Sequence, residues 1–162
     1  MIRGAVGGAV ILGATLLVGN QNFNGSGIDL ISMAMEGNTE WWFFIAKMAF
    51  TIVTVGCCFK GGEIVPSFAI GATFGCLFSQ IVGIDPAFGA AVGMVAMFCC
   101  MVNCPLASLL IGIELFGAGA IYYFAAVCAI SFLLSGNFGL YRTQNILYSK
   151  VIDMARGNKN GK

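Results

Sequence analysis

The sequence predicts an all-α protein whose transmembrane helices cross the bilayer several times and are interrupted and tilted. Two observations carry this prediction. Of the 162 residues, 59% are hydrophobic and 9% are charged, whereas soluble domains are about 45–50% apolar and about 25% charged. In addition, four uncharged runs each supply the ~20 helical residues that cross a bilayer core: residues 4–28, 64–84, 86–113 and 115–141.

Glycine and proline break these runs at intervals too short for straight spans. Broken helices are tolerated at membrane depth where the freed backbone faces protein or a polar cavity, and transporters use such helix ends to hold ions. A cleaved signal peptide explains the first run poorly, because further apolar segments follow it.

Composition also excludes several function classes. The net charge of +1 provides no basic field that would recruit nucleic acid. The chain has no histidine, no nucleophile elbow and no metal-spaced cluster, so we expect neither an enzyme, nor a metal site, nor a cofactor. We expect the cysteines to be small buried hydrophobes rather than a disulfide framework, because their number is odd. They are Cys57, Cys58, Cys76, Cys99, Cys100, Cys104 and Cys128.

The first 58 residues are predicted to form two apolar helices joined by polar segments. The order is a helix at 3–18, a Gly- and Asn-rich connection at 19–29, a short amphipathic turn at 30–35, a loop at 36–40 and an apolar helical segment at 41–58. Trp41 and Trp42 open the last segment as interfacial aromatics. Lys47 lies inside it, so this side chain must snorkel, pair with an acid or face a polar cavity. We expect it to pair with an acid rather than touch an ion.

Two further helices are defined by their start signals. Gly61 and Gly62 end the preceding segment, and Pro66 is tolerated in the first turn of a helix that should reach residue 82. Asp85 as N-cap and Pro86 as first helical residue begin the next helix, which should end near Asn103.

The last part of the chain is predicted to contain three more helical segments. A break at 103–105 precedes a short helix to about 116, a glycine-rich junction leads to a segment that reaches 135, and an amphipathic helix covers 146–156. Glu114 has two interpretations: an acid buried in the membrane, which would be a functional candidate, or an acid at the membrane interface. Five of the eight basic residues fall in the last 21, which places the C-terminus on the cytoplasmic side.

The most informative stretch is FKGGEIVPSF, at residues 59–68. A helix N-terminus offers unpaired N–H donors and about half a positive charge, so the backbone at Glu63, Ile64 and Val65 could cradle an anion. Gly61 and Gly62 have no side chain, so an anion could approach the backbone closely. An ionised Glu63 would repel that anion unless it points away, binds the N–H groups itself or takes a proton, which would couple the two movements. Alternatively, Glu63 only complements the helix dipole at a wet interface.

These residues resemble a known family. The run CFKGGEIVPSFAIGATFG, at residues 58–75, is similar to the segment typical of CLC chloride channels and proton-coupled anion antiporters. The resemblance continues in NFNGSGIDLI and WWFFIAKMAFTIVTVG upstream, and in NCPLASLLIGIELFG and GNFGLYRTQNILYSK downstream. Several separated motifs in the right order cover almost the whole chain.

The resemblance implies site residues that the bare sequence does not. The backbone amides of Glu63 and Ile64 would coordinate the central anion, with Gly62 and Val65 beside them. Tyr148 would donate a hydrogen bond from its hydroxyl to the anion. Gly61 and Pro66 would mark the start of the helix that points at the site. Without the resemblance, Tyr148 is typical of an interface anchor.

The ion is left open between chloride and fluoride. The acid after the double glycine resembles the fluoride/proton branch of the family, whose motif is similar to GGEVTP. Val65 stands where that branch tends to have threonine.

The family fold is an inverted repeat of two membrane halves, and the chain resembles the second half only. Motifs similar to GREGP and GSGIP, expected in the first half, have no counterpart in the proper place, and Ser26 in GSGID is assigned to loop structure. We therefore expect residues 1–157 to be the C-terminal half of a CLC-type transmembrane domain and 158–162 a polar cytoplasmic tail. The chain would be either a fragment or one piece of a split protein.

The implied partners are chloride or fluoride, protons, membrane lipid and an N-terminal half of the same fold. The resemblance also implies a homodimer of the complete protein through small residues at 105–135, in the cell membrane. Two hypotheses follow: an anion-translocating channel or antiporter, and a structural half that conducts nothing without its partner.

Overall fold

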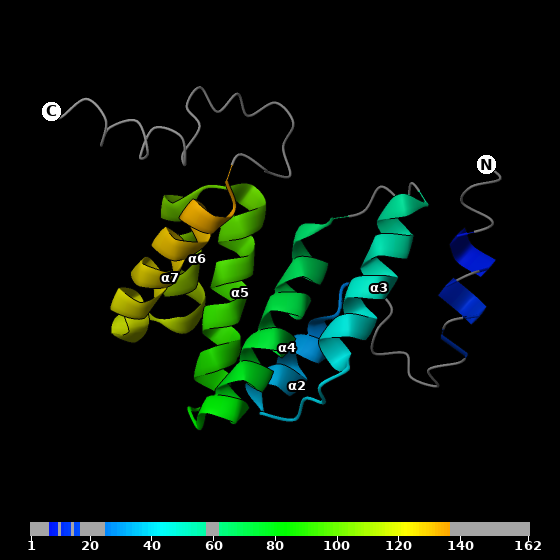
Figure 1. The fold of residues 1–162 in the computed structure, drawn as a ribbon, viewed down its shortest axis with the longest axis horizontal. Coiled ribbons are helices and arrows are strands. Elements are labelled where there is room, and N and C mark those ends of the chain that lie inside the picture. The colour runs from blue at the N-terminus through cyan, green and yellow to red at the C-terminus, as the bar shows by residue number, and fades with distance from the viewer. Residues whose placement is uncertain (1–6, 10, 14, 17–24, 58–61, 137–162) are drawn as a thin grey trace, which may run out of the picture. The chain divides into compact units, whose positions relative to one another are not determined.

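The protein is represented by a computed structural model that describes residues 7–9, 11–13, 15–16, 25–57 and 62–136. All regular structure in these residues is helical, which confirms the predicted all-α class (Figure 1). The named helices are α2 (Ile28–Met35), α3 (Phe43–Gly56), α4 (Ile64–Val82), α5 (Pro86–Val102), α6 (Pro105–Phe116) and α7 (Ile121–Leu134), with a 3₁₀ turn at Ala118–Ala120.

Helix α4 is the described helix that is long and apolar enough to cross a membrane by itself. It ends at Gly83, whose φ of +81° is readily adopted by glycine. The N–H groups of Gly83 and Ile84 both donate to the carbonyl of Ser79, at 2.8 and 2.9 Å. The predicted end near residue 82 is therefore confirmed.

Helix α5 starts as the sequence predicts. Asp85 accepts a hydrogen bond from the N–H of Ala87 at 3.4 Å, and Pro86 is the first helical residue. The helix is shorter than α4 and ends at Val102, because Asn103 turns the chain away.

The described residues divide between two compact units, Met1–Met94 and Val95–Lys162. In the first unit, α2 and α3 both pack against α4 (Figure 1). Leu30, Phe43, Phe50 and Ala69 form its buried apolar cluster. Two of these side chains come from α3, and each of the other two helices supplies one, so burial of apolar area holds the three helices together.

Glycines let α4 and the start of α5 approach backbone to backbone within the first unit. A Cβ on Gly75 would lie 3.0 Å from the Cα of Gly93, and a Cβ on Gly89 would lie 2.6 Å from the carbonyl oxygen of Gly75. Such contacts are typical of membrane helices that cross at small residues.

In the second unit, α6 and α7 run side by side (Figure 1). An apolar groove of about 380 Å³ lies on this pair. It is lined by Pro105, Leu106, Leu109, Ala125, Cys128, Ala129, Phe132 and Leu133. The thiol of Cys99 in α5 donates to the carbonyl of Cys128 at 3.4 Å, which joins α5 to α7.

The predicted break at 103–105 is centred on Asn103, which has a φ of +58° and is buried. Its Nδ2 donates to the carbonyl of Gly136 at 3.3 Å, and its Oδ1 accepts from the hydroxyl of Ser135 at 3.3 Å. Asparagine tolerates the left-handed backbone, and its amide satisfies polar groups that the end of α7 leaves unpaired.

Some predictions need correction or lie outside the described residues. The amphipathic turn expected at 30–35 is an eight-residue helix that begins at Ile28. None of the six described cysteines forms a disulfide, and Cys76, Cys99 and Cys128 are buried as expected. Cys57 and Cys100 are half-buried, and Cys104 is exposed where it precedes Pro105 at the break. The described residues of the helix predicted at 3–18 are helical. Cys58, the helix at 146–156 and the boundary at 157 lie outside the described residues.

Candidate functional site

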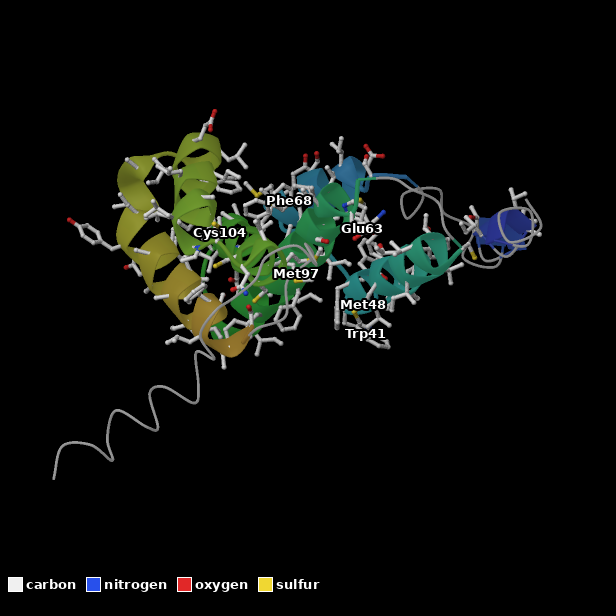
Figure 2. All side chains as sticks on the ribbon, turned by 90° about the horizontal axis from the view of Figure 1, so that it is seen from above. Trp41, Met48, Glu63, Phe68, Met97 and Cys104 are labelled. Atoms are coloured by element: carbon white, nitrogen blue, oxygen red, sulfur yellow. The ribbon has the colours of Figure 1, made fainter. Side chains whose placement is uncertain are left out.

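The candidate site is the start of α4, which Figure 2 marks with Glu63. Glu63 precedes Ile64, the first helical residue, and Pro66 is the third residue of the helix. The N–H and the hydroxyl of Ser67 both donate to the carbonyl of Glu63, at 3.4 and 2.6 Å. These two bonds close the first turn and fix the direction in which the helix begins.

The first turn presents backbone N–H groups that the helix itself does not use. In the part of the chain that the structure describes, the N–H groups of Ile64 and Val65 make no hydrogen bond. Pro66 contributes no N–H. The two amides therefore carry the partial positive charge of the helix N-terminus without a partner among the described atoms.

The space beside these amides is open. Gly62 is exposed, and a Cβ added there would meet no described atom within 4 Å. The side chains of Ile64 and Val65 are half-buried, so the surroundings are largely apolar. A small anion can therefore approach two N–H donors at the start of this helix.

The carboxylate of Glu63 leaves the helix donors available. Its side chain is half-buried and makes no capping hydrogen bond to α4. Of the alternatives drawn from the sequence, the one in which Glu63 binds the N–H groups itself is therefore wrong. Pointing away, exchanging a proton and complementing the dipole all remain compatible with this geometry.

Lys47 is fully buried, at 1% exposure, so it does not snorkel. Its Nζ donates to the carbonyl of Gly25 at 2.9 Å. An acidic partner was predicted for Lys47, and the carbonyl of Gly25 was not. The two glycines around Ser26 could have pointed to this contact, since they mark a turn whose carbonyl groups are accessible to a donor. Ser26 itself is exposed in that turn, as expected.

The remaining predicted residues are distributed as follows. The structure brings together Gly62, Glu63, Ile64, Val65 and Pro66, whereas Gly61 and Tyr148 lie outside the described residues. Glu114 is exposed late in α6, which favours the interfacial interpretation.

Two further points concern the site. Sequence reasoning missed Ser67, whose buried hydroxyl holds the Glu63 carbonyl; a serine four residues into an apolar run gives no distinctive signal. Within the described ranges, no group of three His, Cys, Asp or Glu residues could hold a metal.

Comparison with known proteins places this geometry in a family. Residues 1–136 match the family described as voltage gated chloride channel, the CLC family. The chain belongs to this family. The prediction made from its motifs is confirmed, and CLC membership makes the chain part of an integral membrane protein.

Individual CLC relatives show the same likeness. The chain is 34% identical over 155 residues to the chloride/fluoride channel protein of Pseudomonas syringae pv. tomato. This match covers 92% of the chain and 34% of the relative. The chain is also 29% identical over 126 residues to the H(+)/Cl(-) exchange transporter ClcA of Vibrio parahaemolyticus serotype O3:K6. This match covers 71% of the chain and 27% of the relative.

The fold matches a solved CLC structure as well. A crystal structure of a CLC-type fluoride/proton antiporter aligns with a TM-score of 0.81 at 26% identity, over 86% of this chain and 35% of that one. The chain therefore spans about a third of the length of its relatives. Its assignment to the C-terminal half of the CLC fold stays a prediction.

Proposed function

We propose that the chain supplies an anion-binding part of the transport pathway of a CLC-type protein, either a voltage-gated chloride channel or a proton/anion antiporter. The observation that carries this proposal is the start of α4, where the N–H groups of Ile64 and Val65 lack described partners beside the open space at Gly62. An anion held there replaces part of its hydration shell with backbone donors and the helix dipole.

The remaining parts of the anion site come from the family resemblance. The amides of Glu63 and Ile64 coordinate the ion, and Tyr148 donates its hydroxyl from the C-terminal segment. Gly61 and Pro66 set the entry of the chain into α4. An N-terminal half of the same fold supplies the other walls, and the complete protein is a homodimer in the cell membrane with a cytoplasmic C-terminus.

The transported ion is chloride or fluoride, and the fluoride/proton branch is the alternative within the family. The acid at Glu63 supports that branch, and so do the names of the Pseudomonas relative and of the solved antiporter, both of which mention fluoride. Val65 favours chloride, because valine lacks the hydroxyl of the threonine that the fluoride-type motif has at this position. Glu63 is the candidate for proton coupling.

A second candidate function is a structural half that conducts nothing without its partner. The observation that favours it is coverage, since the chain matches only about a third of its relatives. Both candidates predict anion transport by the complete protein, and they differ in whether this chain contributes groups that bind the anion.

Ion efflux from lipid vesicles tests the proposal. The complete protein, meaning this chain together with the rest of the CLC fold, should release chloride or fluoride selectively. Gly62→Ala should raise the half-saturating anion concentration about tenfold, since the new methyl group enters space that no described atom fills.

The matched control is Gly119→Ala. Gly119 is also exposed, and a Cβ there would meet no described atom within 4 Å, but it lies on the turn between α6 and α7. Equal transport by wild type and Gly62→Ala would contradict the placement of the anion, and an absence of any anion flux would contradict the function itself.

A further inference from the structure

Lys47 raises a question that anion binding at α4 does not answer. It is fully buried inside α3, a helix that is otherwise apolar or uncharged. A polar nitrogen in such surroundings requires a hydrogen-bond partner. The carbonyl of Gly25, 22 residues earlier in the chain, accepts from Nζ at 2.9 Å. Lys47 therefore joins α3 to the turn that precedes α2.

The turn at residues 25–27 is shaped to receive this side chain. Gly25 and Gly27 have φ values of +68° and +80°, which glycine adopts without strain. A Cβ on Gly27 would lie 2.7 Å from Cε and 2.9 Å from Nζ of Lys47. Glycine is thus needed at 27 for two separate reasons, the backbone conformation and the room for the lysine.

The same glycine contacts α4. A Cβ on Gly27 would also lie 3.0 Å from the Cβ of Ala69, which is completely buried in the apolar cluster of the first unit. Ala69 is the sixth residue of α4, so it lies about 7.5 Å along the helix axis from Ile64. Lys47, the glycine turn and the first two turns of α4 therefore form one packed group.

We propose that Lys47 is a positioning residue for the anion site: by holding the glycine turn between α3 and Ala69, it fixes the first turns of α4 and the N–H groups that they present. The inference rests on the proposed function of that helix end. Lys47 does not touch the ion and acts through the turn. A shift of the turn tilts the start of α4, and donors that are misplaced by a fraction of an ångström bind an anion less well.

Two single variants disturb this group in different ways. Lys47→Leu removes Cε and Nζ, and with them the hydrogen bond to Gly25. Gly27→Ala keeps the lysine and pushes a methyl group into it. The control for backbone strain is Gly83→Ala, because Gly83 has a φ of +81° and a Cβ there would meet no described atom within 4 Å.

Transport by the complete protein in vesicles gives the first readout. Both variants should raise the half-saturating anion concentration about three- to tenfold with less change in maximal rate, whereas Gly83→Ala should leave it unchanged. The double variant Gly27→Ala with Lys47→Leu should be less impaired than the sum of the two single variants once the strain measured at Gly83 is allowed for, since the methyl group no longer meets Cε and Nζ and keeps only its close contact with the Cβ of Ala69.

Hydrogen exchange at the backbone amide of Ser67, which donates to the carbonyl of Glu63 and closes the first turn of α4, gives the second readout, which needs no transport. Both single variants should exchange faster there than wild type at equal amounts of folded protein. Lower melting temperatures with unchanged half-saturation and unchanged exchange would overturn the inference, because they indicate a role in stability alone. Wild-type protein without anion flux would instead contradict the proposed function, and exchange would still decide the role of Lys47.

Discussion

At the scale of single residues, the start of α4 combines backbone amides that could attract an anion with an acid that would complicate its binding. In the proposed site the amides of Ile64 and Val65 provide the attraction, and the hydroxyl of Ser67 stabilises the first turn of the helix. Glu63 adds a carboxylate beside the same helix end without binding to it. An acid so placed either exchanges a proton with the pathway or only complements the dipole, and one substitution separates these roles.

Glu63→Gln is expected to abolish proton movement coupled to anion flux while some anion flux persists, because glutamine preserves shape and hydrogen bonding but carries no titratable proton. The measurement is simultaneous recording of anion efflux and internal pH in vesicles. The exposed Glu114 in α6 provides the control, and Glu114→Gln should leave coupling intact. Unchanged coupling in Glu63→Gln would identify Glu63 as a dipole-complementing acid.

At the scale of helices, α4 and the start of α5 pack closely at glycines. Gly75, Gly89 and Gly93 leave no room for a Cβ between the two backbones, so this crossing depends on the absence of side chains. Van der Waals contact between backbones is a principal source of association in a bilayer, where burial of apolar area from water contributes little.

Gly75→Ala should destabilise the protein by about 1–3 kcal/mol, because its methyl group would meet the carbonyl of Gly89 and lie 3.0 Å from the Cα of Gly93. Thermal unfolding in detergent would show a lower midpoint. The control is Gly56→Ala at the exposed end of α3, where a Cβ would meet no described atom within 4 Å. That control should be neutral or slightly stabilising, and equal midpoints for the two variants would refute the close crossing.

At the scale of the whole molecule, the chain is about a third of a CLC protein by length. An anion pathway needs walls on all sides, since backbone at membrane depth must face protein or a polar cavity. In the proposed function, the first turn of α4 supplies one side of such a pathway.

The 162-residue chain by itself is therefore expected to give no selective anion flux. Vesicles that contain only this chain should release chloride and fluoride at the rate of protein-free vesicles. Addition of an N-terminal half should restore selective efflux. Selective uptake by the chain without a partner would show that it completes its own pathway.

The sequence by itself determined the helical class, most helix boundaries and the family. Asp85, Pro86 and the Asn103 to Pro105 break are local signals, because capping and backbone preference act within a few residues. The glycine and proline pattern around Glu63 likewise marked the start of α4 as the candidate site.

Tertiary structure decided what depends on residues far apart in the chain. Lys47 donates to a carbonyl 22 residues away, and Asn103 bonds to Ser135 and Gly136 across more than thirty residues. No local preference encodes such pairs. They exist because the packing of helices brings polar groups together where water is absent and an unpaired donor is unfavourable.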